Sequence, residues 1–564
     1  MANLDPIWNK KIKESDRALD PLGVNRVNDR MVGELLQGIT TLSSRARYYP
    51  VYLWFIDQIH KIKPKADASQ FYRMFKDMER IFMLSCVSHE EIEPKKNHKD
   101  VNGADKGRKI WKESTGKIPL EFTYMGNTLG GYGYYYQGPI QSLGLRQQLV
   151  DDEFERSSEL GKKIIAPFDE IAKQTEFLSL LGKNNTSKKS IQEIGTKLCL
   201  CKLKDPEPNE KIALRQLFFA ENGNYYREAI FRRESLTLFL SIIQQANKKL
   251  VRLNTQSFLS ACYFNQIQEN GNTFPIVIPT KLSDISDKWK IVKAQDHLAY
   301  TLDSILQCFL QFLKTKNGAS LDEFFETVFS DKLQREINSI TNKANSKNSI
   351  LDNNLKAILE LIISSNLQDA NFADIEKTSK DFDEKTSILS SVNEHNCIKN
   401  IEGELKTKKP DVVKVVANGV FVVLITASRM FWRNTQRTPA WDWLSKLQRV
   451  DIGVEEFCSE IMSEFKTDQT SFREFIRSFI KNRVIINHDK IYRAKLHSNS
   501  VQKNFFEKAG NNYRQVRERK AEHRNIRFDS VVSLLNDLDL VNLSDNTLEC
   551  TVDGEKTIKR NTDT

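Results

Sequence analysis

Glycine and proline are scarce in this chain. Its 564 residues include 23 glycines and 14 prolines, together about 7%, where globular proteins average roughly 12%. Turn-dense β architectures and collagen-like repeats depend on these two residues, so both are disfavoured. Because 40% of the residues are hydrophobic, the chain has enough apolar material to fold. The composition predicts a globular, mainly helical protein.

Paired cysteine motifs are also lacking. The eight cysteines are scattered at positions 86, 199, 201, 262, 308, 397, 458 and 550, without the framework of a secreted disulfide-rich domain. Cys199-x-Cys201 is the one close pair, and no second Cys/His pair stands at the spacing of a zinc finger. The sequence therefore predicts no metal, no cofactor and a reducing, cytoplasmic location.

Long apolar runs are absent as well. The first residues lack the apolar core of a signal peptide. The longest apolar stretch, residues 412–427, is interrupted by Lys414, Asn418 and Gly419 and is shorter than the roughly 20 residues of a membrane span. We expect no membrane contact, and residues 412–427 as a buried helix.

Helical periodicity dominates the rest of the chain, as in the stretch from residue 31 to 85. Residues 118–168 and 528–558 differ, because each places a short apolar helix beside turn-rich, strand-like residues. That order is typical of the end of a winged helix, although an ordinary helix end produces the same letters. The predicted fold is mainly α and multidomain, with small winged-helix-like α+β modules.

A chain of this length needs more than one hydrophobic core. Polar connectors at 204–211 and 342–354, and an acidic stretch at 369–385 that we expect to be a loop, are the candidate boundaries. They predict five domains: an N-terminal helical layer (1–110), a winged-helix-like module (111–203), a central helical domain (212–345), a second helical domain (355–470), and a basic helix with a C-terminal winged-helix-like module (471–564).

Positive charge is concentrated in one segment. Residues 473–527 hold 15 Lys/Arg and 5 Asp/Glu, an excess of 10 that equals the net charge of the whole chain, +10. On a helix, Arg514, Arg517, Lys520 and Arg524 share one face. Such a stripe can neutralise nucleic-acid phosphates, whereas the alternative is an ordinary solvated face.

Arginines and tyrosines stand together in the stretch TLSSRARYYPVYLWF at 41–55. If Arg45 and Arg47 precede a helix that starts at Pro50, they lie on an extended segment and form a cationic edge beside Tyr48 and Tyr49. If the segment is already helical, the two arginines diverge. These four residues are candidates for a ligand site or for a structural role in which the arginines pair with buried acids.

Common enzyme motifs are lacking. Walker, Gly-x-Ser-x-Gly and His-Glu-x-x-His motifs are missing, and no catalytic residue is predicted. Asp383 with Glu404-Leu405-Lys406 matches the letters of a metal-dependent nuclease, whose acids lie on a hairpin and hold Mg²⁺. The sequence around Glu404 lacks strand-like alternation, so a divergent nuclease is kept only as an alternative.

The segment GITTLSSRARYYPVYLWF at 38–55 resembles the N-terminal signature of a prokaryotic family whose genes lie in antiviral defence islands, beside large helicases or nucleases. Accessory subunits of Druantia-type systems are one example. Looser matches cover YYQGPIQSLGL, residues 289–310 and SVVSLLNDLDL. The resemblance implies a non-catalytic component of a bacterial anti-phage system. Its expected partners are other proteins of the same operon, among them a large helicase, and DNA; the alternative without nucleic acid is a protein–protein adaptor.

Overall fold

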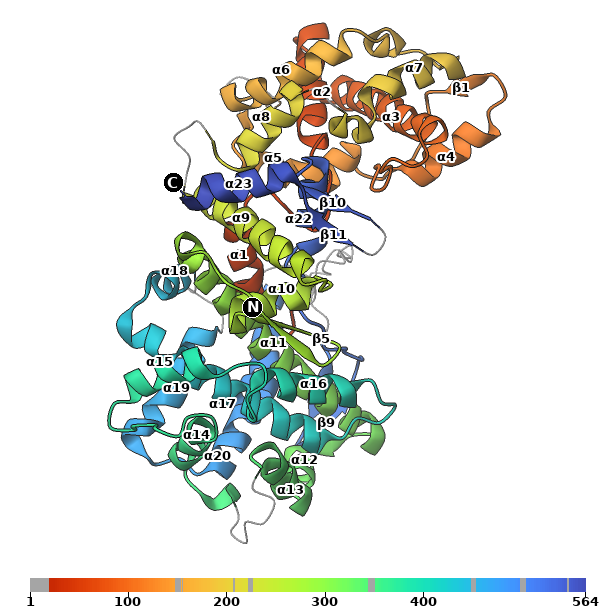
Figure 1. Cartoon of the computed structure of the whole chain (residues 1–564). Coiled ribbons are helices and arrows are strands. Elements are labelled where there is room, and N and C mark those ends of the chain that lie inside the picture. Colours follow the sequence, from red (N-terminus) through yellow and green to blue (C-terminus); the bar gives the residue numbers. More distant parts are fainter. Residues whose placement is uncertain are drawn as a thin grey trace, which may run out of the picture. The chain divides into compact units, whose positions relative to one another are not determined.

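The structure, a computed structural model, describes residues 20–147, 154, 156–205, 208–221, 227–342, 350–447, 453–497, 504–544 and 547–563. These residues are mainly helical, as the composition predicts, and the strands are few and short (Figure 1). Parts of the predicted connectors at 204–211 and 342–354 lie outside the described residues.

The helices, in chain order, are α1 Asn25–Leu35, α2 Tyr48–Ile62, α3 Ala68–Ile92, α4 Ala104–Glu113, α5 Gln137–Ser142, α6 Glu159–Ala172, α7 Lys188–Leu198, α8 Pro208–Phe218, α9 Arg227–Lys248, α10 Thr255–Phe264, α11 Ser283–Lys316, α12 Leu321–Val328, α13 Asp331–Ile340, α14 Leu355–Ser364, α15 Ile375–Lys385, α16 Glu394–Leu405, α17 Val412–Gln436, α18 Pro439–Leu447, α19 Val454–Thr467, α20 Phe472–Ser478, α21 Asn487–His497, α22 Phe528–Asp537 and α23 Val552–Asp563. Short 3₁₀ turns lie at η2 Phe177–Leu180, η3 Leu200–Lys204, η4 Thr280–Leu282 and η5 Ile350–Asp352, and π-helical turns at η1 Tyr132–Tyr136 and η6 Phe479–Ile486.

All strands pair in small antiparallel sheets. The two-stranded pairs are β1 Lys117–Pro119 with β4 Asn185–Ser187, β2 Arg146–Gln147 with β3 Arg156–Ser157, β5 Gln266–Glu269 with β6 Asn272–Pro275, and β10 Val541–Leu543 with β11 Leu548–Cys550. The three-stranded sheet has β9 Asn512–Gln515 between β7 Ala319–Ser320 and β8 Phe506–Ala509.

The chain divides into two compact units, each assembled from separate stretches. Unit 1 comprises residues 1–31, 259–275 and 287–524, and unit 2 comprises residues 32–258, 276–286 and 525–564. The five contiguous domain ranges drawn from the connectors stay a prediction.

Helix α3 is central to its part of unit 2, where it packs against α2, α4 and α7. It begins with a capping box in which the Asp67 side chain accepts from the Gln70 backbone N–H. The contact with α7 requires a glycine, because a Cβ at Gly195 would lie 2.3 Å from the carbonyl oxygen of Ser85. The helices expected between residues 31 and 85 are thereby confirmed.

Helix α17 is central to unit 1 and packs against α13, α15, α16 and α19. By length and composition it could cross a membrane, but 89% of its most apolar window is buried inside the protein. That is the packing of a core helix in a globular protein, as expected for residues 412–427.

Two local expectations are wrong. Residues 375–385 of the expected acidic loop form α15, whose buried face carries Thr378, Ser379, Phe382 and Asp383. A helix whose inner face is largely polar shows no hydrophobic period, so the pattern was invisible in the sequence. The helix expected to carry Arg514, Arg517, Lys520 and Arg524 is instead strand β9 followed by an irregular segment. In unit 2, α22 is followed by the β10–β11 hairpin and α23, the order expected of a winged helix, although the winged-helix fold itself stays a prediction.

Candidate functional site

The four cations predicted to contact phosphates begin on a β-hairpin in the last part of the basic segment. Arg514 lies in β9, opposite Glu507 of β8, and residues 516–527 form neither helix nor strand. Arg514, Arg517 and Lys520 are exposed, whereas Arg524 is half-buried. The shared helical face predicted for these four cations is therefore wrong, because pairing of β9 and contacts with buried acids outweigh the helical preference of the segment.

Acidic side chains within unit 1 anchor the second half of the segment. The Arg519 guanidinium lies 2.7 Å from the Asp303 carboxylate, and the Arg524 backbone N–H donates to Asp296 at 2.9 Å. Two guanidinium nitrogens of Arg524, Nε and Nη2, are buried. Of the four residues predicted to contact phosphates, Arg514, Arg517 and Lys520 are exposed, whereas Arg524 is half-buried.

His523 joins two carboxylates in the same segment. Its Nδ1 lies 2.9 Å from Asp296 and its Nε2 lies 2.9 Å from Glu402, while the ring stacks on Tyr300 with centroids 3.9 Å apart. Burial lowers the pKa of His523, but the two carboxylates outweigh burial and raise it. The imidazolium therefore ties the irregular segment to α11 and α16.

Arg45 is buried in unit 2, with an exposed fraction of 0%. Its Nε donates to the Asp537 carboxylate at 2.9 Å, and its Nη1 donates to the carbonyls of Lys99 at 2.6 Å and Asn97 at 3.4 Å. The guanidinium thus holds the loop after α3 against α22.

Arg47 is also buried and stands at the N-cap position of α2, where its side chain makes no capping hydrogen bond. Its Nε and Nη2 each donate to the Glu210 carboxylate at 2.8 Å, and its Nη1 donates to the carbonyls of Cys199 at 2.6 Å and Lys197 at 3.3 Å. The bidentate pair links the start of α2 to α8, and the bonds to the two carbonyls hold the end of α7. The exposed cationic edge considered for these two arginines does not form, and buried acids pair with both, although these acids stand far away in the sequence.

The two tyrosines are buried next to the arginines. The Tyr48 hydroxyl accepts from the Asn102 backbone N–H at 2.8 Å, and its ring stacks on Tyr52 with centroids 5.0 Å apart. The Tyr49 hydroxyl donates to the carbonyl of Gly38 at 2.5 Å. Burial raises the pKa of both phenols, so they stay neutral. Residues 45–49 therefore form a structural core at the start of α2.

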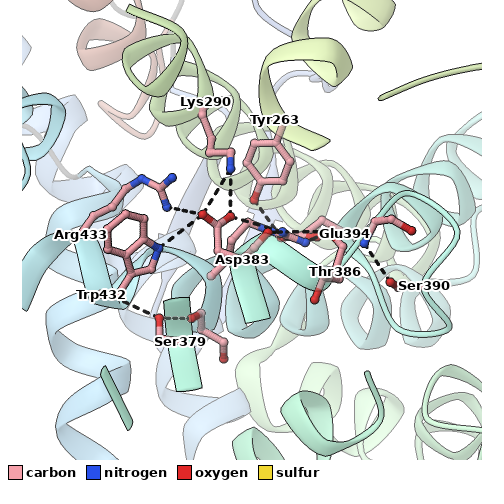
Figure 2. Close-up of polar contacts among 12 residues, drawn as sticks. Tyr263, Lys290, Ser379, Asp383, Thr386, Ser390, Glu394, Trp432 and Arg433 are labelled. Atoms are coloured by element: carbon pink, nitrogen blue, oxygen red, sulfur yellow. Dashed lines mark hydrogen bonds and ion pairs between the residues drawn. The ribbon is translucent and has the colours of Figure 1, made fainter. Parts of the chain in front are cut away.

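A buried ion network lies in unit 1 (Figure 2). The Asp383 carboxylate lies 2.7 Å from Arg433 and 3.0 Å from Lys290, and the Glu394 carboxylate lies 2.9 Å from Arg429. Burial alone would raise the pKa of Asp383, but the surrounding cations outweigh burial and lower it. Arg433 also pairs with Asp287 at 2.9 Å, so the network joins α11, α15, α16 and α17 with three cations facing three carboxylates.

The residues of the nuclease alternative do not have the arrangement that its motif requires. Asp383 lies on α15 and Glu404 on α16, whereas the motif requires a hairpin. Glu404 pairs with Lys414 at 2.8 Å, and Lys406 is exposed just beyond the end of α16. Both acids are occupied by cations of the protein itself, so they are not arranged to hold Mg²⁺.

One group of side chains in the described part of the chain has the composition of a metal site: His89, His98, Cys199 and Cys201, all buried. The sequence predicts no metal, because no second Cys/His pair stands at zinc-finger spacing. In the fold, however, two histidines from the region of α3 lie beside the Cys-x-Cys pair. Burial raises the pKa of the Cys199 thiol, and the contact with Cys199 together with burial raises that of Cys201. A bound cation would displace both thiol protons.

No family model matches this chain, and neither a curated protein nor a solved structure does.

Proposed function

We propose that this protein is a non-catalytic, cytoplasmic component of a bacterial antiviral defence system that contacts nucleic-acid phosphates through Arg514, Arg517 and Lys520. Its proposed partners are other proteins of the same operon, among them a large helicase. The resemblance of residues 38–55 to a defence-island family supports the setting. The helix–hairpin module of α22, β10 and β11 is its winged-helix-like element.

One observation supports the phosphate contact most directly. Glu518 and Arg519 are each ion-paired within unit 1, to Lys314 and Asp303. The neighbouring exposed cations are Arg514, Arg517 and Lys520. In the part of the chain that the structure describes, none of the three forms an ion pair with a carboxylate. Cations that lack an internal partner can replace the counterions of a polyanion, which makes binding sensitive to salt.

Fluorescence anisotropy of a labelled DNA duplex over a range of salt concentrations tests the proposal. Three phosphate contacts predict a slope of about −2.7 in log K against log salt. The triple variant Arg514→Ala, Arg517→Ala, Lys520→Ala is expected to lose that slope and most of the affinity at low salt.

A matched control removes the same charge elsewhere in unit 1. Lys406, Lys408 and Lys409 are exposed, so changing all three to alanine is expected to preserve most of the binding. Equal loss in both triple variants would show a diffuse charge effect and contradict a defined interface. Absence of binding by the wild-type protein at low salt would favour the adaptor, and Mg²⁺-dependent DNA cleavage that disappears in Glu404→Ala would overturn the non-catalytic assignment.

A further inference from the structure

Four metal-binding side chains converge in unit 2 from distant parts of the chain. His89 lies in the last turn of α3, and His98 lies in the loop that follows. Cys199 directly follows α7, and Cys201 lies in the short turn η3. One nitrogen or sulfur atom from each residue lies within 4.8 Å of the corresponding atoms of the other three.

Three separations between these atoms are close to those in a tetrahedron of zinc ligands. Cys201 Sγ lies 3.3 Å from His89 Nδ1, Cys199 Sγ lies 3.6 Å from His98 Nδ1, and the two sulfur atoms are 3.4 Å apart. A zinc ion with bonds of about 2.3 Å to sulfur and about 2.05 Å to nitrogen holds tetrahedral ligands about 3.5 Å (S–N) and about 3.8 Å (S–S) apart. The two S–N separations are within about 0.3 Å and the S–S separation within about 0.4 Å of these values, and the remaining pairs lie within 4.8 Å.

Contacts outside the group orient its ligands. The Nε2 of His98 lies 2.9 Å from the carbonyl oxygen of Glu93, so this nitrogen carries the proton and Nδ1 presents its lone pair to the cysteines. The Nε2 of His89 lies 3.4 Å from the Glu93 carboxylate. A carbonyl and a carboxylate behind the histidines are the usual outer partners of zinc-bound imidazoles.

The two buried arginines of residues 41–55 fix the loops that carry the ligands. Arg45 donates to the carbonyl of Lys99, next to His98, and Arg47 donates to the carbonyl of Cys199 itself. Both loops are therefore held in place by the protein, so the ligands need little ordering when an ion binds.

Charge and burial identify the class of ion. Two thiolates and two neutral imidazoles around a divalent cation give a neutral complex, and a neutral complex can be buried without a large desolvation cost. All four positions are filled by buried protein side chains, so no open position remains for a water or a substrate. A closed Cys₂His₂ set is typical of structural zinc.

We propose that His89, His98, Cys199 and Cys201 bind one zinc ion that joins α3, α7 and their following loops in unit 2. The ion releases two thiol protons on binding and takes part in no reaction. Because the four ligands come together only in the folded chain, zinc binding stabilises the folded form of unit 2.

Elemental analysis of the tag-free full-length protein, purified without chelator, tests the site. We expect one zinc per chain in the wild type and in Cys550→Ser, which changes a half-buried cysteine of the same unit outside the group. The double variant Cys199→Ser, Cys201→Ser is expected to lose the zinc. Zinc well below one per chain in the folded wild type, zinc retained by the double variant, or another metal in its place would overturn the proposal.

A spectroscopic measurement on the wild type keeps the test independent of whether the variants fold. Protein produced with cobalt in place of zinc is expected to show the visible bands of tetrahedral Co²⁺ and the near-ultraviolet charge-transfer band of cobalt–thiolate bonds. X-ray absorption at the zinc edge should give two sulfur ligands at about 2.3 Å and two nitrogen ligands at about 2.05 Å. A shell of oxygen and nitrogen alone would show surface-bound metal and contradict the site.

Discussion

Replacing Arg47 by methionine tests how the start of α2 is held. Methionine keeps most of the aliphatic length but removes the guanidinium. The carboxylate of Glu210, whose side chain is 3% exposed, then stays buried without its bidentate partner, and the carbonyl of Cys199 loses a donor at 2.6 Å.

The expected cost follows from this burial. Removing one partner of a buried ion pair destabilises a protein by about 3–5 kcal/mol, because an uncompensated charge remains. For a unit of this size, about 2 °C of melting temperature corresponds to 1 kcal/mol, so the midpoint should fall by about 6–10 °C. Thermal unfolding followed by tryptophan fluorescence measures the shift.

Two further variants separate the buried charge from lost packing. Arg47→Met combined with Glu210→Met removes both charges and is expected to recover most of the midpoint, since apolar replacements of a buried pair are often neutral. Lys162→Met breaks an exposed pair with Glu159 in the same unit and should leave the midpoint unchanged. The reasoning is refuted if Arg47→Met shifts the midpoint by less than about 2 °C, or if the double variant is as unstable as the single one.

Three other variants test the packing and ion pairs. Asp383→Asn should cost about 3–5 kcal/mol in urea unfolding at neutral pH, because it removes the carboxylate that three buried cations share; Glu384→Gln, exposed on the same helix, should not. The pKa of Asp383 is lowered in the folded protein. The stability difference between the wild type and Asp383→Asn should therefore shrink as the pH falls below about 4. A difference that does not depend on pH would contradict the pairing. The pKa of His523 is raised in the folded protein. The stability lost in His523→Gln should therefore be largest below about pH 6.5 and decline as the pH rises through the folded pKa. The opposite trend in urea titrations would show a neutral ring. Gly195→Ala should lower the free energy of unfolding by about 1–3 kcal/mol, because the new Cβ would meet a backbone carbonyl of α3. Gly403→Ala, in open space on α16, should raise it by about 0.5–1 kcal/mol. Similar unfolding midpoints for the two variants would refute the close helix contact.

Local composition was enough for the class of fold and for the apolar helices. The scarcity of glycine and proline predicts a mainly helical chain, and hydrophobic periods locate the helices between residues 31 and 85 and the buried helix at 412–427, all of which the structure contains. These features depend on side chains within one or two turns of each other, so a single stretch of sequence carries the whole signal.

Features that depend on distant partners were not visible in this way. Arg45 and Arg47 have their carboxylates at Asp537 and Glu210, and α15 places polar residues on its buried face because the cations that meet Asp383 come from α11 and α17. The four side chains of the proposed zinc site stand about 100 residues apart as two pairs, so no spacing rule applies to them.

The amino-acid sequence by itself determined the mainly helical class, the apolar helices and where positive charge accumulates along the chain. Tertiary structure alone decided which charges are neutralised and which sulfur and nitrogen atoms meet, because burial and ion pairing are set by chain segments that only folding brings into contact.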